Sequence, residues 1–294
     1  MKTRARSAFI MAPLLIIVFL GGYYLMAGVF VLSWLAINEF CAAFGERRPA
    51  RWAIRASLIV LYSVYLYSVF TNALYLRPFF TDPLWTIPFW IFISILLGFI
   101  SMFAMEKRDL LQGMATFVGM FYINFLAFHL IMVDAGSFGD SWGFQTRGLF
   151  SGIYSFVWIV VLAAFGTDIF AYFTGKLLGR HKLCPSISPG KTVEGAVGGV
   201  VGSVVLCGLF GWFLLPHDFI LCVIIGVAGG VVSQLGDLSA SVMKRKIGIK
   251  DWGTMIPGHG GVLDRIDSLL FTAPLAYYIL YVGTKLFWVS DIVW

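Results

Sequence analysis

Acidic residues occur at two places in this sequence where the surrounding residues are apolar. Asp264 and Asp267 open the segment DRIDSLLFTAPLAYYILYVG, and Asp237 lies near the end of an earlier apolar run. Residues three apart share a face of a helix, and two carboxylates that close repel each other unless a cation lies between them. One aspartate at a helix head is ordinary, because the helix dipole favours negative charge there. Two aspartates beside Arg265 and a glycine-rich loop indicate a metal site instead.

Asp237 belongs to a polar stripe on its own helix. Four polar residues are spaced to stack along one helix face: Ser233, Asp237, Ser241 and Lys244. An ionisable residue inside an apolar span marks a functional site by default. Ser241 would either add an oxygen ligand to those of the aspartates or orient Asp237. Hard oxygen ligands of this kind predict Mg²⁺ rather than zinc. Lys244 and Arg245 would bind an anion, although basic residues at such a helix end are also typical of a membrane surface.

The stretch KDWGTMIPGHGGVLDRID predicts an anion-binding loop. Pro257 with Gly258, Gly260 and Gly261 prevents a helix through its middle. The backbone N–H groups of the glycines would face an anion, as in other glycine-rich phosphate-binding loops. His259 is open to two interpretations: a proton carrier or phosphate donor, or a residue that only packs in the loop.

A third polar stretch, ISPGKTVEG at residues 187–195, precedes another apolar run. Ser188, Lys191 and Thr192 ahead of a helix N-terminus would cradle a triphosphate. The stretch lacks the GxxxxGK[ST] pattern and follows no predicted strand, so we reject a P-loop fold. In the alternative interpretation Thr192 caps the following helix. Upstream, Asp168 lies inside an apolar run and needs a partner, and Lys176 stands two helical turns away.

The elements that must position these residues are membrane helices. The chain of 294 residues is 60% hydrophobic and 12% charged, with a net charge of +6, and its mean hydropathy is +0.88. Soluble domains have about 45–50% apolar and about 25% charged residues. The excess apolar sequence must face lipid, so we expect a membrane partner and no nucleic acid. The four cysteines have no CxxC spacing, which argues against a disulfide framework or a zinc site.

An all-α polytopic membrane fold with nine spans is predicted from the apolar runs. The spans are residues 8–22, 24–43, 54–74, 84–105, 112–133, 152–175, 193–215, 218–240 and 263–287. The first two are short, and would form either a tight hairpin or one long helix kinked at Gly21 and Gly22. The basic start of the chain resembles a signal peptide, but no small-residue cleavage site follows, so we expect a retained first span.

Basic residues set the expected orientation. With the N-terminus in the cytoplasm, all but three of the 21 lysines and arginines fall on the cytoplasmic side, the exceptions being Arg77, Arg147 and Lys285. This asymmetry follows the positive-inside rule. An odd number of spans then places the C-terminus outside.

The polar signals divide the chain into two expected regions. Residues 1–150 carry few of them and are expected to be N-terminal membrane helices with a structural, dimer-forming or lipid-facing role. Residues 151–294 are expected to be the catalytic membrane domain, with cytoplasmic loops at 176–192 and 241–263.

The residues that carry this chemistry also resemble a known family. Residues 241–267, SVMKRKIGIKDWGTMIPGHGGVLDRID, resemble the signature of the bacterial-type phosphatidate cytidylyltransferases, also called CDP-diacylglycerol synthases. The matching positions are Ser241, Lys244, Arg245, Lys250, Asp251, Gly253, Pro257, His259, Gly260, Gly261, Asp264, Arg265 and Asp267. The segments GTDIFAYFTGKLLGRHKL and ISPGKTVEG resemble other parts of that family. The specific resemblance covers residues 166–268, and the first 150 residues match only in size and hydropathy.

The resemblance implies an all-helical membrane enzyme that makes CDP-diacylglycerol and pyrophosphate from CTP and phosphatidic acid. It implies Mg²⁺ held by Asp237 and Asp264, with K⁺ as a second cation beside it. It also implies a homodimer in the bacterial cytoplasmic (inner) membrane, with the active site on the cytoplasmic side.

Residues and resemblance together give the expected site. The predicted catalytic residues are Asp237, Asp264, Asp267, Lys244, Arg265 and His259. The predicted metal ligands are Asp237, Asp264, Asp267 and Ser241. The predicted substrate-binding residues are Ser188, Lys191, Thr192, Lys244, Arg245, Lys250, Gly260 and Gly261.

Two other functions fit parts of the sequence. A CTP-dependent polyprenol or phytol kinase of the same membrane superfamily would phosphorylate a lipid alcohol, but the complete KRxxxxKD to DRxD pattern disfavours it. Carboxylates inside membrane spans also mark cation-coupled transporters. The sequence has no internal inverted repeat, and its polar residues gather near one membrane face instead of the midplane, which disfavours transport.

Overall fold

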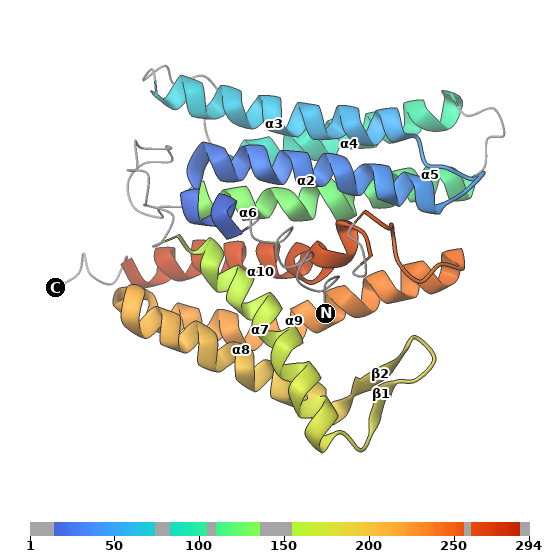
Figure 1. Cartoon of the computed structure of the whole chain (residues 1–294). Coiled ribbons are helices and arrows are strands. Elements are labelled where there is room, and N and C mark those ends of the chain that lie inside the picture. The colour runs from blue at the N-terminus through green and yellow to red at the C-terminus, as the bar shows by residue number, and fades with distance from the viewer. Residues whose placement is uncertain (1–14, 74–82, 105–109, 136–154, 256–259, 289–294) are drawn as a thin grey trace. The chain divides into compact units, whose positions relative to one another are not determined.

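Long helices make up nearly all of the structure (Figure 1). The computed structural model describes residues 15–73, 83–104, 110–135, 155–255 and 260–288. The elements are α2 (Gly22–Ala43), α3 (Arg51–Ala73), α4 (Pro83–Ala104), α5 (Leu110–Gly119), the π-helical turn η1 (Met120–Phe125), α6 (Leu126–Ala135), α7 (Val157–Leu178), β1 (Lys182–Cys184), β2 (Ser188–Thr192), α8 (Val193–Leu214), the 3₁₀ turn η3 (Pro216–Asp218), α9 (Phe219–Ile247) and α10 (Leu263–Trp288).

Eight helical segments among the described residues are long and apolar enough to cross a membrane. They coincide, within several residues, with eight of the expected spans, so the prediction of an all-α membrane protein is confirmed. Residues 8–14 of the remaining expected span, 8–22, lie outside the described residues. The total of nine spans and the orientation of the termini stay predictions.

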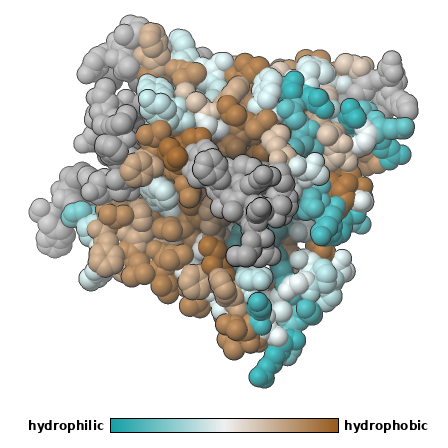
Figure 2. Space-filling view, viewed as in Figure 1, coloured by the Kyte–Doolittle hydropathy of each residue, from teal (hydrophilic) through white to brown (hydrophobic). Residues whose placement is uncertain are grey.

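Large apolar side chains lie exposed along these helices, as contact with lipid requires. On α8 they recur at every fourth residue, so they form one stripe: Val193, Val197, Val201, Val205 and Leu209. Figure 2 shows mostly brown, apolar side chains over the visible faces of α7 and α8, and paler or teal ones near the β1–β2 hairpin.

The chain forms two compact units. The N-terminal unit contains residues 1–131, 135–150 and 252–263, and the C-terminal unit contains residues 132–134, 151–251 and 264–294. Part of the second expected cytoplasmic loop, residues 252–263, thus belongs to the N-terminal unit. The different roles predicted for residues 1–150 and 151–294 stay predictions.

The N-terminal unit begins with a sharp reversal. Residues 15–20 are helical, and Gly21 and Gly22 then take positive φ angles of 63° and 53°. Side chains disfavour this backbone region, so the two glycines permit the turn. A Cβ added at Gly28 would lie 2.5 Å from the side chain of Ile17. Since these residues would lie far apart on one straight helix, the chain folds back here, as in the hairpin alternative.

Buried polar contacts connect the helices of the N-terminal unit. Asn124, in the π-helical turn η1, donates a hydrogen bond to the Ile54 carbonyl at 2.9 Å. The indole of Trp90 on α4 donates to the Ser57 carbonyl at 2.9 Å. Each contact satisfies a polar group that would otherwise be costly inside an apolar bundle.

Glycines allow the helices of the C-terminal unit to pack backbone against backbone. A Cβ added at Gly199 of α8 would lie 2.9 Å from the Thr167 carbonyl oxygen of α7. A Cβ added at Gly226 of α9 would lie 2.9 Å from the Cα of Val204 on α8. Such small-residue seams are the usual way in which membrane helices approach closely.

Two regions expected to be loops contain regular structure. Residues 182–192 include the antiparallel β1–β2 hairpin, in which Lys182 pairs with Thr192. The helix α9 continues to Ile247, so it keeps Ser241 and Lys244 on the helix of Asp237 as predicted. Gly248, with φ of 83°, ends α9 in the left-handed conformation that glycine favours at this position.

We expect Gly226→Ala to destabilise the protein and Gly208→Ala to leave its stability unchanged or higher. The added methyl at 226 meets the Val204 backbone, which cannot move unless α8 and α9 separate. A Cβ at Gly208 meets only Val223, at an ordinary 3.7 Å, and alanine favours a helix over glycine by about 1 kcal/mol. Thermal unfolding in detergent measures both variants. The midpoint of Gly226→Ala should fall by at least ~2 °C, and equal midpoints would contradict the close packing.

Candidate active site

The C-terminal unit contains a cavity of about 450 Å³. Its walls come from the second half of α7, the strand β2, the start of α8 and the second half of α9. Three predicted substrate-binding residues, Ser188, Lys191 and Thr192, line it together with Asp237. The structure therefore brings the ISPGKTVEG stretch and the polar end of α9 to one place.

Lys191 connects the hairpin to α9. Its ammonium group lies 2.5 Å from Oδ2 of Asp237, and both side chains keep about a quarter to a third of their surface exposed, 25% for Lys191 and 31% for Asp237. Because the pair is partly exposed, the ammonium group can exchange Asp237 for another anion in the cavity.

Asp168 is an acidic residue of the site to which the sequence alone assigned no role. It lies on α7, lines the cavity, and accepts a hydrogen bond from the Ser268 hydroxyl at 3.3 Å. Lys176, the partner expected from helical spacing, instead lies 6.0 Å from the centroid of the Tyr172 ring. The signal for Asp168 was present in the sequence, since it is an ionisable residue inside a membrane span.

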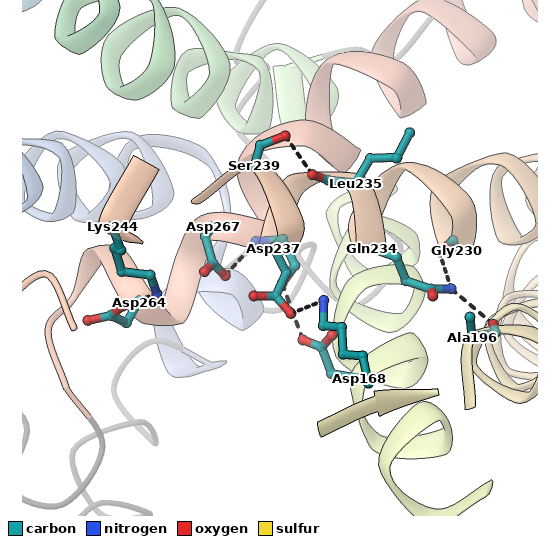
Figure 3. Close-up of polar contacts among 12 residues, drawn as sticks. Asp168, Ala196, Gly230, Gln234, Leu235, Asp237, Ser239, Lys244, Asp264 and Asp267 are labelled. Carbon is teal, nitrogen blue, oxygen red and sulfur yellow. Dashed lines mark hydrogen bonds and ion pairs between the residues drawn. The ribbon is translucent and has the colours of Figure 1, made fainter. Parts of the chain in front are cut away.

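Asp264 and Asp267 are the acidic residues at the head of α10. Lys244 of α9 lies 2.7 Å from Oδ1 of Asp264, and the two side chains are only 9% and 5% exposed. Asp267 is buried, and its Oδ1 accepts a hydrogen bond from the Ser268 amide at 2.8 Å. Figure 3 shows Asp168, Asp237 and Asp267 directed toward one region, with the pair of Lys244 and Asp264 beside them.

The aspartates of the site carry more negative charge than the two lysines that pair with them. Asp168, Asp237 and Asp267 lie near enough for their charges to act on one another. Lysines pair with Asp237 and Asp264, whereas Asp168 and Asp267 form no ion pair within the part of the chain that the structure describes. Carboxylates gathered in this way favour a bound cation.

The donor set fits Mg²⁺ in kind, because carboxylate and hydroxyl oxygens are its preferred protein ligands. Over the described ranges, no three His, Cys, Asp or Glu side chains form a ready-made metal-binding group. Lysine ammonium groups occupy the positions beside Asp237 and Asp264, where a cation is needed. The predicted ligand set of Asp237, Asp264, Asp267 and Ser241 stays a prediction, with Ser241 buried on α9 one turn beyond Asp237.

The other predicted substrate-binding residues lie in different surroundings. Thr192 caps α8, since its hydroxyl accepts a hydrogen bond from the Gly195 amide at 3.1 Å. Arg245 is exposed and donates to the Ile249 carbonyl at 2.9 Å, just past the end of α9. Lys250 is exposed, and neither it nor Arg245 lines the cavity.

The glycine loop lies in the N-terminal unit. Gly260 has a φ of 83°, a conformation that side chains disfavour, and Gly261 is buried. The prediction for His259 lies outside the described residues. Arg265 follows on α10, near enough to Asp168 for their charges to interact.

Comparison with known proteins gives the family. The profile of the cytidylyltransferase family matches residues 2–282. The chain belongs to this family. It is therefore a membrane enzyme of the nucleotidyltransferase class, which confirms the resemblance seen in the sequence.

Bacterial proteins are among the relatives of this cytidylyltransferase. A phosphatidate cytidylyltransferase of Synechocystis sp. is 33% identical over 283 residues, which cover 89% of each chain. One of Bacillus subtilis is 45% identical over 127 residues, covering 43% of this chain and 47% of the relative. One of Haemophilus influenzae is 43% identical over 140 residues, covering 46% and 47%.

In this cytidylyltransferase we expect Lys244→Met to reduce stability far more than Lys246→Met. Lys244 is buried against Asp264, and its loss breaks a buried ion pair, which costs about 3 kcal/mol. Lys246 is exposed at the same end of α9 and serves as the matched control, with an expected change within about 0.5 kcal/mol. Thermal unfolding in detergent compares the two. Similar losses of stability in both variants would show that the buried pair of Lys244 and Asp264 does not stabilise the protein.

Proposed function

We propose that this enzyme transfers the CMP moiety of CTP to phosphatidic acid, giving CDP-diacylglycerol and pyrophosphate. The relative that covers 89% of this chain is named phosphatidate cytidylyltransferase. The observation that carries the proposal is the cavity in which Lys191 and Asp237 meet between the ends of membrane helices. A reaction between a lipid phosphate and a water-soluble nucleotide needs charged groups at such a place.

The chemistry is an in-line displacement at phosphorus. An oxygen of the phosphatidate phosphate forms a bond to the α-phosphorus of CTP, while the bond from that phosphorus to the bridging oxygen of pyrophosphate breaks. A phosphomonoester has a second pKa of about 6, so the nucleophile is already anionic near neutral pH and needs no strong general base. The difficulty is repulsion between two polyanions, so positioning and charge neutralisation carry the catalysis.

Three basic residues and three aspartates have roles in that scheme. Lys191, with Lys244 and Arg265, would bind substrate phosphates. Asp237 and Asp264 would hold Mg²⁺, with Asp267 and Ser241 as further oxygen ligands and K⁺ nearby. Bound Mg²⁺ would neutralise charge on the reacting phosphates.

We also propose a position for the enzyme in the membrane. The basic residues favour a cytoplasmic N-terminus and an active site on the cytoplasmic side of the bacterial inner membrane. CTP is made in the cytoplasm, so this orientation gives the enzyme access to its soluble substrate. We include a homodimer in the proposal because the family resemblance implies one.

We expect purified protein in detergent to move label from cytosine-labelled CTP into the lipid phase when phosphatidic acid and Mg²⁺ are present. EDTA should abolish the transfer. Asp264→Asn should reduce the rate by ~100-fold or more, because charge stabilisation of the transition state is lost. Asp218→Asn, at the far end of α9 from Asp237, is the matched control and should leave the rate unchanged.

The product decides between the proposal and its rivals. Unlabelled lipid from a monodisperse, folded sample would reject cytidylyl transfer. Lipid labelled from γ-labelled CTP would indicate a lipid kinase instead, and ion flux in liposomes would indicate a transporter.

We expect Asp237→Asn to raise the Mg²⁺ concentration at half-maximal rate by ~10-fold or more, because a neutral amide attracts a divalent cation less than a carboxylate does. Asp168→Asn should act in the same direction, since its charge lies close to that of Asp237. Mg²⁺ titration of the transfer rate measures both, with Asp218→Asn as the control. Unchanged half-maximal concentrations in both variants would remove these residues from the metal site.

A further inference from the structure

A buried carboxylate of the N-terminal unit holds the backbone at the head of α10. Glu39 of α2 is 7% exposed. Its Oε1 accepts a hydrogen bond from the Val262 amide, and its Oε2 accepts one from the Leu263 amide, both at 2.9 Å. Within the described residues Glu39 forms no ion pair. Its charge is therefore stabilised by these two N–H groups.

Two described stretches, residues 252–255 and 260–263, both reach this carboxylate. A Cβ added at Gly253 would lie 2.8 Å from Oε1 of Glu39, and one added at Gly261 would clash with Oε2. Trp252 is buried and packs against Phe40, with ring centroids 5.4 Å apart. Glycine at 253 and 261 thus leaves the space that Glu39 fills.

An ordinary helix cap does not explain the arrangement. Val262 precedes the first residue of α10 and has no side-chain acceptor, although Ser, Thr, Asp or Asn at this position would cap the helix locally. A buried carboxylate inside an apolar span is a costly substitute for such a cap. Glu39 instead fixes the position of Leu263 relative to α2, although the two bonded residues are more than 220 positions apart in the chain. Asp264 directly follows Leu263.

We propose that Glu39 is a positioning residue of the cytidylyltransferase reaction. By holding the Val262 and Leu263 amides, it fixes where the chain enters α10 and hence where Asp264 starts. It also occupies two N–H groups of the glycine-rich segment, so these two are not open to a substrate phosphate. The catalytic part of this inference rests on the proposed function, whereas the backbone contacts do not.

The sequence carried a signal for Glu39. It is the only charged residue of α2, and an ionisable residue inside a membrane span marks a functional site. The sequence could not predict its hydrogen-bond partners, because they are backbone amides, which do not depend on residue type.

The test compares Glu39→Gln with Glu46→Gln in the full-length protein in nanodiscs. Glutamine keeps the shape of Glu39 but has one acceptor oxygen and no charge, so at least one amide loses its partner. Glu46 is exposed just beyond the end of α2 and is the matched control. Hydrogen exchange by mass spectrometry should show the Val262 and Leu263 amides exchanging ~10-fold faster or more in Glu39→Gln. Peptides of α8 should be unchanged.

Kinetics separate positioning from simple stabilisation. We expect Glu39→Gln to lower kcat by ~10-fold or more, because small displacements of reacting groups cost this much, with KM for CTP changed less than about twofold. The monodisperse fraction and the thermal midpoint report folding. A variant with faster exchange but unchanged kcat would overturn the positioning role, and unchanged exchange would overturn the contact itself.

Gly253→Ala provides a second, independent disruption. Its methyl group would push on Oε1 of Glu39. We therefore expect the same faster exchange at Val262 and Leu263 and the same lower kcat. If Glu39→Gln does not fold, this variant tests the positioning role. In the double variant the two effects should not add, because both act on one contact. If the wild-type protein makes no CDP-lipid, the proposed function fails, and the exchange measurement alone then shows whether Glu39 holds the two amides.

Discussion

The constraint on which the structure depends is the cost of placing carboxylates at the ends of membrane helices. A charge in such surroundings must be paired or hydrogen-bonded. Each acidic residue meets this requirement differently: Lys191 pairs with Asp237, Lys244 pairs with Asp264, and backbone amides hold Glu39. Asp168 and Asp267 accept hydrogen bonds from Ser268, and neither forms an ion pair within the described residues. The four aspartates of the site thus carry more negative charge than the two lysines that pair with them, and such a surplus favours a bound cation.

Close helix packing makes this arrangement possible. The α7–α8 and α8–α9 contacts depend on glycines whose Cβ atoms would meet neighbouring backbone, as at Gly199 and Gly226. A similar approach occurs at Gly236, where a Cβ would lie 2.9 Å from the Asp267 carbonyl oxygen of α10. Gly236 directly precedes Asp237, so the absence of a side chain there lets the carboxylates of α9 and α10 come near each other.

The sequence predicted those features that depend on local spacing. Apolar runs give the membrane helices, because length and hydropathy are properties of each segment alone. The stripe of Ser233, Asp237, Ser241 and Lys244 follows from helical periodicity, and α9 carries all four. Partners distant in the chain were beyond such reasoning. Lys176 was expected beside Asp168 because both lie on one helix, yet Asp168 bonds to Ser268, which another helix supplies. The β1–β2 hairpin was missed because its strands are three and five residues long.

The ion pairs of the site and the backbone contacts at the head of α10 have different consequences. Ion pairs such as that of Lys191 and Asp237 are partly exposed and can exchange one anion for another, which a substrate-binding site requires. The amides of Val262 and Leu263 cannot change partners in the same way, because a buried N–H group without an acceptor is costly. The backbone that enters α10 is therefore held firmly, while the partly exposed Lys191 can respond to a substrate. Phosphoryl chemistry that relies on positioning gains from both properties, since the acidic side chains at the head of α10 must stay fixed while the phosphate-binding groups adapt.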